Sequence, residues 1–398
     1  MFGKTIVNTL RYNARTRSGR TLSSKLEDYL RAISHNSTSN LIPKYANTIR
    51  VSNVINIGGV MSQNVYSMTL TFTDGGTTRQ KNLVLKTYRS QNIDPVLKAY
   101  IHNEDLRRYV REFQTLRSLR RVGFPVPEVY LCESDSSFLG CPFVIMQREE
   151  VAQKSTTDLD SFAATLAHLH NLRVSELGIP VLKSPKDEYA FARRWPIHFK
   201  HYLNLETKHD KRLKKKFDLA IQWLNSTAPN IYCPQYCLIH GDYHPANVYS
   251  TKDSKSIVLD WESVEIGDPA FDVGYAYHYI KFFSEPQNPN SAERAAERFI
   301  SEYNRNFHGD INRRIEFYKI VGILGPSIYY SSGLSSFTKA YTYHQRQVLF
   351  SIPFLSGPII FLGFPFITRP YIAQKLGALS DIYWLRYFEN FLDETVKP

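Results

Sequence analysis

The chain has 398 residues and a formal net charge of +12, and 43% of its residues are hydrophobic. This length and hydrophobic content exclude a disordered chain and allow two domains or one domain with two lobes. The positive charge favours anionic partners, namely nucleotide phosphates, phosphorylated metabolites, nucleic acid or an acidic membrane surface, without choosing among them. Four cysteines in so long a chain exclude a disulfide framework and predict reduced thiols in a cytoplasmic protein.

The N-terminal part has the patterns of a helix followed by an antiparallel sheet. Ser24 and Glu27 form a capping box, which predicts a helix over residues 24–35. Apolar residues then alternate with polar ones, as in strands with one buried face. A helix with an apolar stripe is predicted over residues 103–121. The predicted strands cover residues 51–57, 64–72, 82–88, 123–134 and 141–149.

Helical patterns dominate after residue 147, beginning with an amphipathic stretch at residues 158–172. The order of the elements predicts an α+β fold with two lobes. A small lobe built on the antiparallel sheet would comprise residues 1–147, and a larger helical lobe residues 148–398. A cleft between two such lobes is a natural ligand site.

Two segments raise the question of targeting or membrane association. Leu349–Thr368 carries no charge over twenty residues, which is about the length that spans a bilayer. Pro353 and Pro358 would break a single helix there, so we expect short buried helices and turns rather than a membrane-inserted element. The first 26 residues are basic and contain no acid, which fits a frayed terminus better than a transit peptide.

Three polar residues follow short apolar stretches in "LIHGDYHPANVY" and "SIVLD", namely Asp242, Asn247 and Asp260. Two adjacent strands that end at a shared edge would bring them together. Carboxylate and amide oxygens suit Mg²⁺, so we predict Asn247 and Asp260 as metal ligands and Asp242 as a base for a substrate hydroxyl. Each residue alone is also a common turn residue. Together the spacing H-x-D-x-x-x-x-N and the later strand-terminal aspartate match a phosphoryl-transfer site.

The smaller lobe supplies a cation of the kind such a site needs. Lys86 ends an apolar strand, where the alternative is an edge lysine that faces solvent. Glu112 falls on the buried side of its predicted helix. A buried carboxylate needs a cation, so we predict an ion pair between Glu112 and Lys86.

A glycine-containing stretch lies between the first two predicted strands. Its sequence "GGVMSQNVY" begins with Gly58 and Gly59 and contains Ser62. Backbone N–H groups of such a stretch can cover phosphates, and we predict these three residues as nucleotide contacts. A simple hairpin turn would use the same residues.

Taken together, these stretches resemble the aminoglycoside phosphotransferase family, which includes choline-kinase-like small-molecule kinases. The resemblance spans about residues 55 to 280. It implies a two-lobed protein-kinase-like fold and an ATP- and Mg²⁺-dependent kinase, with GTP as an alternative nucleotide. The matching stretches, in family order, include "IGGVMSQNVYSM", "LVLKTYR", "REFQTLRSL", "LAHLHNL", "LIHGDYHPANVY" and "VLDWESVEIGDPAFDVGY".

The resemblance also implies roles for single residues. Asp242 would be the catalytic base, and Asn247 and Asp260 would hold Mg²⁺. Lys86, paired to Glu112, would steady the α- and β-phosphates of the nucleotide. The strand end that would offer backbone hydrogen bonds to adenine comprises Met146, Gln147 and Arg148.

Other positions refine this picture. Asp272 looks like the family's structural aspartate, which braces the catalytic loop from the start of a helix. The chain departs from protein kinases at His244, where lysine is usual, and at Glu262, where glycine is usual. Histidine at the first position recurs among small-molecule kinases and would touch the transferred phosphate there.

The spacing after Asp260 bears on the phosphate acceptor. Only eleven residues separate it from Asp272, which leaves no room for the peptide-docking segment of a protein kinase. We expect a small hydroxyl-bearing acceptor near Ser184–Tyr202, where Arg194 and Trp195 hint at an anionic or planar molecule. The alternatives are a kinase of hydroxyacyl thioesters and a non-catalytic kinase-like scaffold whose basic surface binds membrane or nucleic acid. We expect no nucleic-acid partner for a kinase, and the oligomeric state stays open.

Overall fold

The computed structural model describes residues 21–34, 41–44, 46–58, 63–88, 108–150, 158–205, 211–250, 256–284, 289–338 and 384–396. These residues fall into two compact units, residues 21–150 and residues 158–396. The predicted boundary between residues 147 and 148 stays a prediction. Among the described residues, no helix has the length and apolar character needed to cross a membrane. Gly59, Ser62 and Leu349–Thr368 lie outside the described residues.

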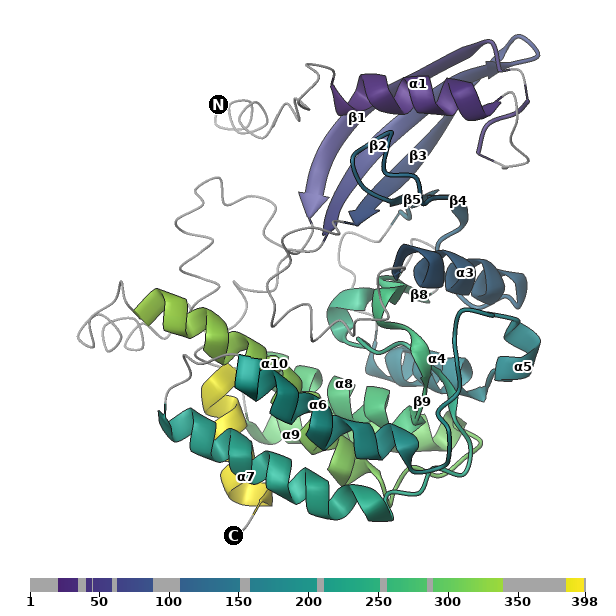
Figure 1. Ribbon diagram of the computed structural model, residues 1–398. Helices are drawn as coiled ribbons and strands as arrows, with labels where there is room; N and C mark the ends of the chain where they lie inside the picture. The colour runs from purple at the N-terminus through teal and green to yellow at the C-terminus, as the bar shows by residue number, and fades with distance from the viewer. Residues whose placement is uncertain are drawn as a thin grey trace. The chain divides into compact units, whose positions relative to one another are not determined.

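The N-terminal unit is built on a five-stranded antiparallel sheet with the strand order β1-β2-β3-β5-β4 (Figure 1). Strands form where apolar residues alternate, so that Met68, Leu70 and Phe72 of β2 are all buried on one face. Gly75 and Gly76 join β2 to β3 with φ angles of 54° and 82°, as a two-residue hairpin turn requires. The predicted sheet is confirmed, except that residues 123–128 of the fourth predicted strand are not part of a strand. The strands are β1 (Thr48–Gly58), β2 (Gln63–Asp74), β3 (Thr77–Tyr88), β4 (Val129–Glu133) and β5 (Phe143–Gln147).

Helix α1 (Leu22–Ser34) packs across one face of this sheet and shares its apolar core (Figure 1). The helix is confirmed, but the predicted capping box is wrong. The helix begins two residues before Ser24, whose amide donates to the hydroxyl of Thr21 at 3.2 Å. Glu27 instead accepts a hydrogen bond from the Val51 amide of β1 at 2.8 Å. The carboxylate therefore ties the helix to the sheet rather than to its own first turn.

Helix α3 (Arg108–Arg121) contacts the side of the sheet opposite α1. Leu85 of β3 joins the apolar core beneath α1, and the next residue, Lys86, points the opposite way because strand side chains alternate. Glu112 of α3 meets Lys86 on that side. The predicted helix over residues 103–121 is thus confirmed from residue 108 onward, and its first five residues lie outside the described part of the chain.

The C-terminal unit is mostly helical (Figure 1). Its helix α8 packs against both α9 and α10, and α6 packs against α7. Two short antiparallel ladders, β6 with β9 and β7 with β8, interrupt the helices. The elements are α4 (Leu159–Asn171), α5 (Val174–Leu177), α6 (Ala190–Leu205), α7 (Lys211–Thr227), β6 (Cys237–Ile239), β7 (Val248–Ser250), β8 (Ser256–Val258), β9 (Glu265–Gly267), α8 (Pro269–Ser284), α9 (Pro289–Asn306), α10 (Ile315–Thr338) and a final helix of residues 384–395.

Candidate active site

The loop between β6 and β7, residues 240–247, carries most of the residues predicted for catalysis. Gly241 at its start has a φ of 81°, and a Cβ there would collide with the backbone carbonyl of Ser263. Both the left-handed backbone and the close approach require glycine. The loop closes in a 3₁₀ turn, where Nδ1 of His244 accepts a hydrogen bond from the Ala246 amide at 3.2 Å.

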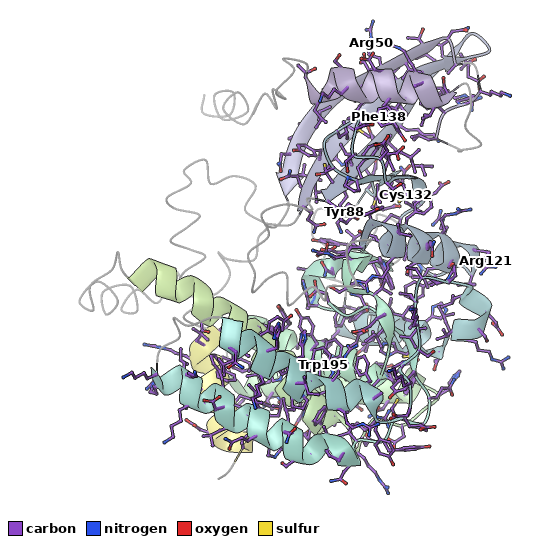
Figure 2. The ribbon with its side chains drawn as sticks, in the orientation of Figure 1. Arg50, Tyr88, Arg121, Cys132, Phe138 and Trp195 are labelled. Carbon is purple, nitrogen blue, oxygen red and sulfur yellow. The ribbon has the colours of Figure 1, made fainter. Side chains whose placement is uncertain are left out.

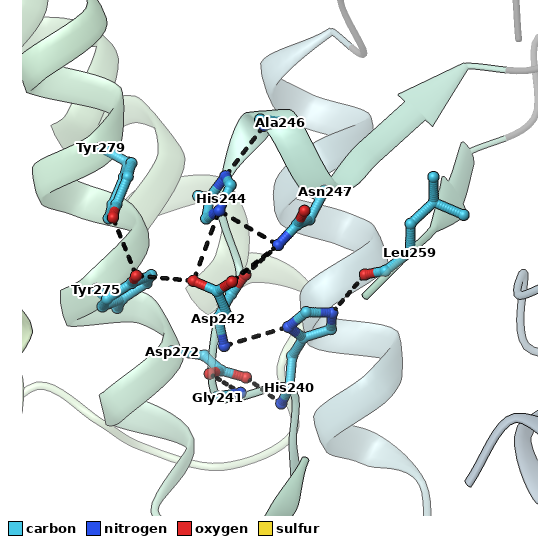
Figure 3. Close-up of polar contacts among 10 residues, drawn as sticks. All are labelled: His240, Gly241, Asp242, His244, Ala246, Asn247, Leu259, Asp272, Tyr275 and Tyr279. Atoms are coloured by element: carbon cyan, nitrogen blue, oxygen red, sulfur yellow. Dashed lines mark hydrogen bonds and ion pairs between the residues drawn. The ribbon is translucent and has the colours of Figure 1, made fainter. Parts of the chain in front are cut away.

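Asp272, in the first turn of α8, holds the start of this loop (Figure 3). Its Oδ2 accepts from the His240 amide at 2.7 Å and its Oδ1 from the Gly241 amide at 2.9 Å. Nε2 of His170, from α4, lies 3.2 Å from the same carboxylate, and Nδ1 of His170 lies 2.8 Å from the hydroxyl of Tyr303. The bracing contacts expected of Asp272 are therefore present. Sequence reasoning assigned no role to His170 or Tyr303, because helical spacing alone does not reveal their polar partners.

His240 links the loop to the strand end that precedes Asp260. Its Nε2 lies 2.9 Å from the Leu259 carbonyl oxygen and so carries the proton, while its Nδ1 accepts from the Asp242 amide at 3.2 Å (Figure 3). The Leu259 amide in turn donates to the Asn247 carbonyl oxygen at 2.8 Å. The backbone next to Asp260 is thus bonded to both ends of the loop.

These contacts correct one prediction about how the site assembles. We expected β6 and β8 to be neighbours with a shared edge. Instead β6 pairs with β9, and β8 pairs with β7. Asp242 and Asn247 meet within the loop itself, and Leu259 connects the strand before Asp260 to that loop.

The Asp242 carboxylate lies at the centre of a polar network (Figure 3). The Tyr275 hydroxyl donates to its Oδ1 at 2.7 Å, and Nδ2 of Asn247 donates to its Oδ2 at 3.2 Å. Nε2 of His244 lies 3.5 Å from Oδ1. Burial by itself raises the pKa of the Asp242 carboxyl, but His244 and the hydrogen bond from Tyr275 outweigh burial, so the pKa lies below its ordinary value. The group is therefore ionised at neutral pH and able to accept a proton.

Asn247 and Asp260 supply oxygen donors of the kind that Mg²⁺ binds. The amide of Asn247 turns its nitrogen toward Asp242, so its oxygen faces away from that carboxylate (Figure 3). Asp260 follows β8 in a left-handed conformation with a φ of 62°. Within the described residues, no cluster of three or more histidine, cysteine or carboxylate side chains could hold a metal. An amide and a carboxylate nevertheless fit Mg²⁺, which commonly takes one or two protein oxygens and completes its shell with phosphates and water.

Lys86 and Glu112 form the predicted ion pair in the N-terminal unit. The Lys86 Nζ lies 3.0 Å from each carboxylate oxygen of Glu112, and both side chains are almost fully buried. Tyr88 lies two residues farther along β3 and is labelled in Figure 2. Its hydroxyl also donates a hydrogen bond to Glu112. A cation and a hydroxyl together compensate for removing this carboxylate from water.

The other described residues that are predicted to bind the nucleotide lie at the ends of two strands. Gly58 is the last residue of β1, and Met146 and Gln147 are the last two of β5. The amides of Gln147 and Arg148 donate to carbonyl oxygens of the same unit at 2.7 and 3.0 Å. Adenine would therefore have to use other backbone groups of this strand end. The nucleotide-binding roles of these four residues stay predictions.

The stretch predicted to receive the acceptor includes much of α6, and two of the side chains singled out there, Arg194 and Trp195, contact other residues of the unit. Trp195, labelled in Figure 2, is buried. Its ring stacks on Phe271, with ring centroids 4.9 Å apart and an interplanar angle of 6°. Arg194 pairs with Glu265, with Nη1 at 2.7 Å from a carboxylate oxygen. These contacts place both side chains within the packing of the unit, and the position of the acceptor stays a prediction.

Comparison with curated proteins finds partial matches. Acyl-CoA dehydrogenase family member 11 of Gallus gallus is 30% identical over 183 residues, which cover 42% of this chain and 22% of that protein. The protein of the same name from Rattus norvegicus is 28% identical over 251 residues, which cover 54% of this chain and 30% of that protein. The chain therefore matches less than a third of the length of either relative.

Comparison with families and solved structures identifies the fold and the family. The chain matches the model of the phosphotransferase enzyme family (APH) over residues 73–310, more than half of its length. A Ralstonia eutropha JMP134 protein assigned as an aminoglycoside phosphotransferase superposes with a TM-score of 0.52 at 16% identity, covering 91% of this chain and 98% of that chain. The chain therefore belongs to the phosphotransferase enzyme family and has the kinase-like α+β fold.

Proposed function

We propose that the protein transfers the γ-phosphoryl group of ATP to a hydroxyl group of a small molecule, with Mg²⁺ and with Asp242 as the base. The observation that carries this proposal is the condition of the Asp242 carboxylate. Tyr275 and Asn247 hold it by hydrogen bonds, and 29% of its side chain remains exposed. A general base must be ionised, oriented and accessible, and Asp242 meets all three conditions.

Each predicted residue then has a part in an in-line transfer. Asp242 accepts the proton of the attacking hydroxyl. Asn247 and Asp260 would hold Mg²⁺, which when bound neutralises charge on the phosphates. Lys86, kept in place by Glu112, would bring a further positive charge to the nucleotide. Positioning and charge neutralisation together supply most of the rate enhancement in such reactions.

Asp242→Asn tests the base, because asparagine keeps the size of the side chain and removes its basicity. We expect ADP formation from Mg·ATP, measured with a pool of hydroxyl-bearing metabolites, to fall by about 100-fold or more. Nucleotide affinity measured by calorimetry should change little. Asp218→Asn, which alters an exposed carboxylate on α7, should leave turnover unchanged. Full turnover by Asp242→Asn would exclude Asp242 as the base, and wild-type turnover that survives a metal chelator would exclude the role of Mg²⁺.

Hydroxyacyl thioesters are a second class of acceptor that one observation favours. The two curated relatives are named as members of an acyl-CoA dehydrogenase family. Acyl-CoA thioesters carry several anionic phosphate groups, which a chain with a net charge of +12 would attract. The same assay with hydroxyacyl thioesters in one arm, and sugars, amino alcohols and aminoglycosides in the other, separates the two classes by which arm yields a phosphorylated product.

A further inference from the structure

Two tyrosines on α8 form a hydrogen-bonded chain that ends on the Asp242 carboxylate. The Tyr275 hydroxyl lies 2.7 Å from Oδ1 of Asp242 and 3.0 Å from the Tyr279 hydroxyl (Figure 3). The Tyr279 ring stacks on the His244 imidazole, with centroids 4.7 Å apart and an interplanar angle of 15°. The chain therefore contacts the catalytic loop both at the carboxylate and at His244.

The helix explains why these residues meet the loop together. Asp272, Tyr275 and Tyr279 are spaced three and four residues apart, so they share one face of α8. Asp272 fixes the loop backbone through the amides of His240 and Gly241. The next turn of the same helix fixes the carboxylate of Asp242. One rigid element thus sets both the loop and the orientation of the base that the loop carries.

The chemistry of the three groups sets the direction of the hydrogen bonds. An ionised carboxylate only accepts, so the single proton of the Tyr275 hydroxyl is directed to Asp242. The Tyr275 oxygen is then an acceptor, and the Tyr279 hydroxyl donates to it. Each bond polarises the next and strengthens it. A carboxylate held in this way keeps one orientation instead of rotating toward solvent.

We propose that Tyr275, supported by Tyr279, is a positioning residue that orients the Asp242 carboxylate for the acceptor hydroxyl. This inference rests on the proposed function, since it concerns the same base. In this proposal the hydroxyl of Tyr275, and not only the packing of its ring, contributes to turnover. Neither tyrosine is required to touch the substrate or the nucleotide.

Tyr277 offers a matched control on the same helix. Like Tyr275 it is buried and uses its hydroxyl in a hydrogen bond, in this case to Glu293 at 2.8 Å. It lies two residues from both Tyr275 and Tyr279, and its hydroxyl bonds to α9 rather than to the catalytic loop. The Tyr277 hydroxyl also accepts a hydrogen bond from Nζ of Lys281 at 3.4 Å. Loss of this hydroxyl therefore tests the effect of lost hydrogen bonds on α8 without a change at Asp242.

The experiment compares Tyr275→Phe, Tyr279→Phe, the double variant and Tyr277→Phe. Turnover is measured as ADP formation from Mg·ATP with the pooled acceptors and also with water alone. We expect Tyr275→Phe to lower kcat by about 10- to 100-fold and to leave the KM for ATP within about twofold, because misorientation affects the chemical step rather than binding. Tyr279→Phe should cause a smaller loss, and the double variant should match Tyr275→Phe because Tyr279 acts through Tyr275. Tyr277→Phe should keep the wild-type kcat.

The possible results separate this inference from the function it rests on. If Asp242→Asn were inactive but Tyr275→Phe kept the wild-type kcat, the positioning role of Tyr275 would be overturned and the proposed function would stand. Equal losses in Tyr275→Phe and Tyr277→Phe would also overturn it, since the effect would then come from α8 as a whole. If Tyr275→Phe did not fold, Tyr279→Phe would decide, because an unchanged kcat there contradicts the chain of bonds. A wild-type protein that consumes no ATP in either assay would overturn the proposed function and this inference with it.

Discussion

The Glu112 carboxylate shows how single residues of this protein balance burial against charge. It is 1% exposed, and it accepts hydrogen bonds from both Lys86 and Tyr88. A buried ion pair adds little stability compared with an apolar pair, but loss of one partner leaves an uncompensated charge. The pair is therefore costly to break, which keeps Lys86 in one position.

Lys86→Met tests this balance at the residue scale. We expect the free energy of unfolding to fall by about 3 kcal/mol, because Glu112 remains buried with Tyr88 as its hydroxyl donor but without its cation. The measurement is urea unfolding followed by circular dichroism. A second change, Glu112→Gln in the same chain, should recover most of the loss. Equal instability of the single and double variants would show that the cost arises from packing and not from the buried charge.

At the scale of elements, α8 contacts the loop of residues 240–247 at two successive turns. Its first turn places Asp272 against the backbone of this loop, and its second turn places Tyr275 against the Asp242 carboxylate. The helix can do this only if its own position is fixed. Gly274 faces the backbone of α10 so closely that a Cβ would lie 2.5 Å from the carbonyl carbon of Tyr318, and a Cβ on Gly322 of α10 would lie 2.9 Å from the Cα of Tyr275. The two glycines let the helix backbones pack directly on each other.

Gly274→Ala should therefore push α8 away from α10. Alanine favours helices by about 1 kcal/mol over glycine, but overpacking against backbone atoms costs about 1 to 3 kcal/mol, so we expect a net loss of stability. Turnover should fall with it, because Asp272 and Tyr275 move with the helix. Thermal unfolding and ADP formation measure the two effects. A variant with wild-type melting temperature and wild-type turnover would contradict the close packing described here.

At the scale of the whole molecule, the last helix joins distant parts of the C-terminal unit. Within residues 384–395, the Tyr387 hydroxyl lies 3.0 Å from Nδ1 of His278, and Nε1 of Trp384 donates to the Ser327 hydroxyl at 3.0 Å. Asp393 pairs with Lys216 of α7 at 2.8 Å. The end of the chain thus packs against α7, α8 and α10, and it contributes to the core that supports the active site.

His278 makes this core sensitive to pH. Burial lowers the pKa of its imidazole from 6.5 to about 3, and Lys281 and Lys319 add to the effect, although a hydrogen bond to the Lys319 carbonyl opposes it. Between pH 6.5 and about 3 the unfolded chain binds a proton that the folded chain does not. Stability from this group is therefore complete above pH 6.5 and is lost as the pH falls, by up to about 1.4 kcal/mol per pH unit.

His278→Gln tests the pH dependence, because glutamine can keep a hydrogen bond but cannot take up a proton. We expect the variant to be less stable than the wild type at pH 7 and to lose less further stability between pH 6.5 and 4. Urea unfolding at a series of pH values gives the free energy of unfolding of each protein and the slope of that free energy against pH. The carboxyl groups contribute equally to the pH dependence of stability in the two proteins. The difference between the two pH dependences therefore reports on His278 alone. Parallel slopes would show that His278 does not couple folding to protons in this range.

Sequence patterns predicted much of the fold and part of the site. Alternation of apolar residues predicted the first three strands, because a strand with one buried face needs apolar residues at every second position. The Lys86–Glu112 pair followed from a carboxylate on the buried side of a helix, which demands a cation. Glu27 was predicted to cap its own helix, but it accepts a hydrogen bond from the Val51 amide of β1. The two backbone amides compete for the same carboxylate, and only the packing of the helix on the sheet decides between them.

By itself the sequence determined which segments become strands and helices and which loop carries Asp242 and Asn247, because those properties depend on neighbours within a few residues. Only the tertiary structure decided what surrounds the Asp242 carboxylate. Tyr275 is 33 residues from Asp242, and Tyr303 is 133 residues from His170. Such contacts depend on how helices pack. A tyrosine on an apolar helix face has the same local pattern whether its hydroxyl bonds to Asp242, as in Tyr275, or to Glu293, as in Tyr277.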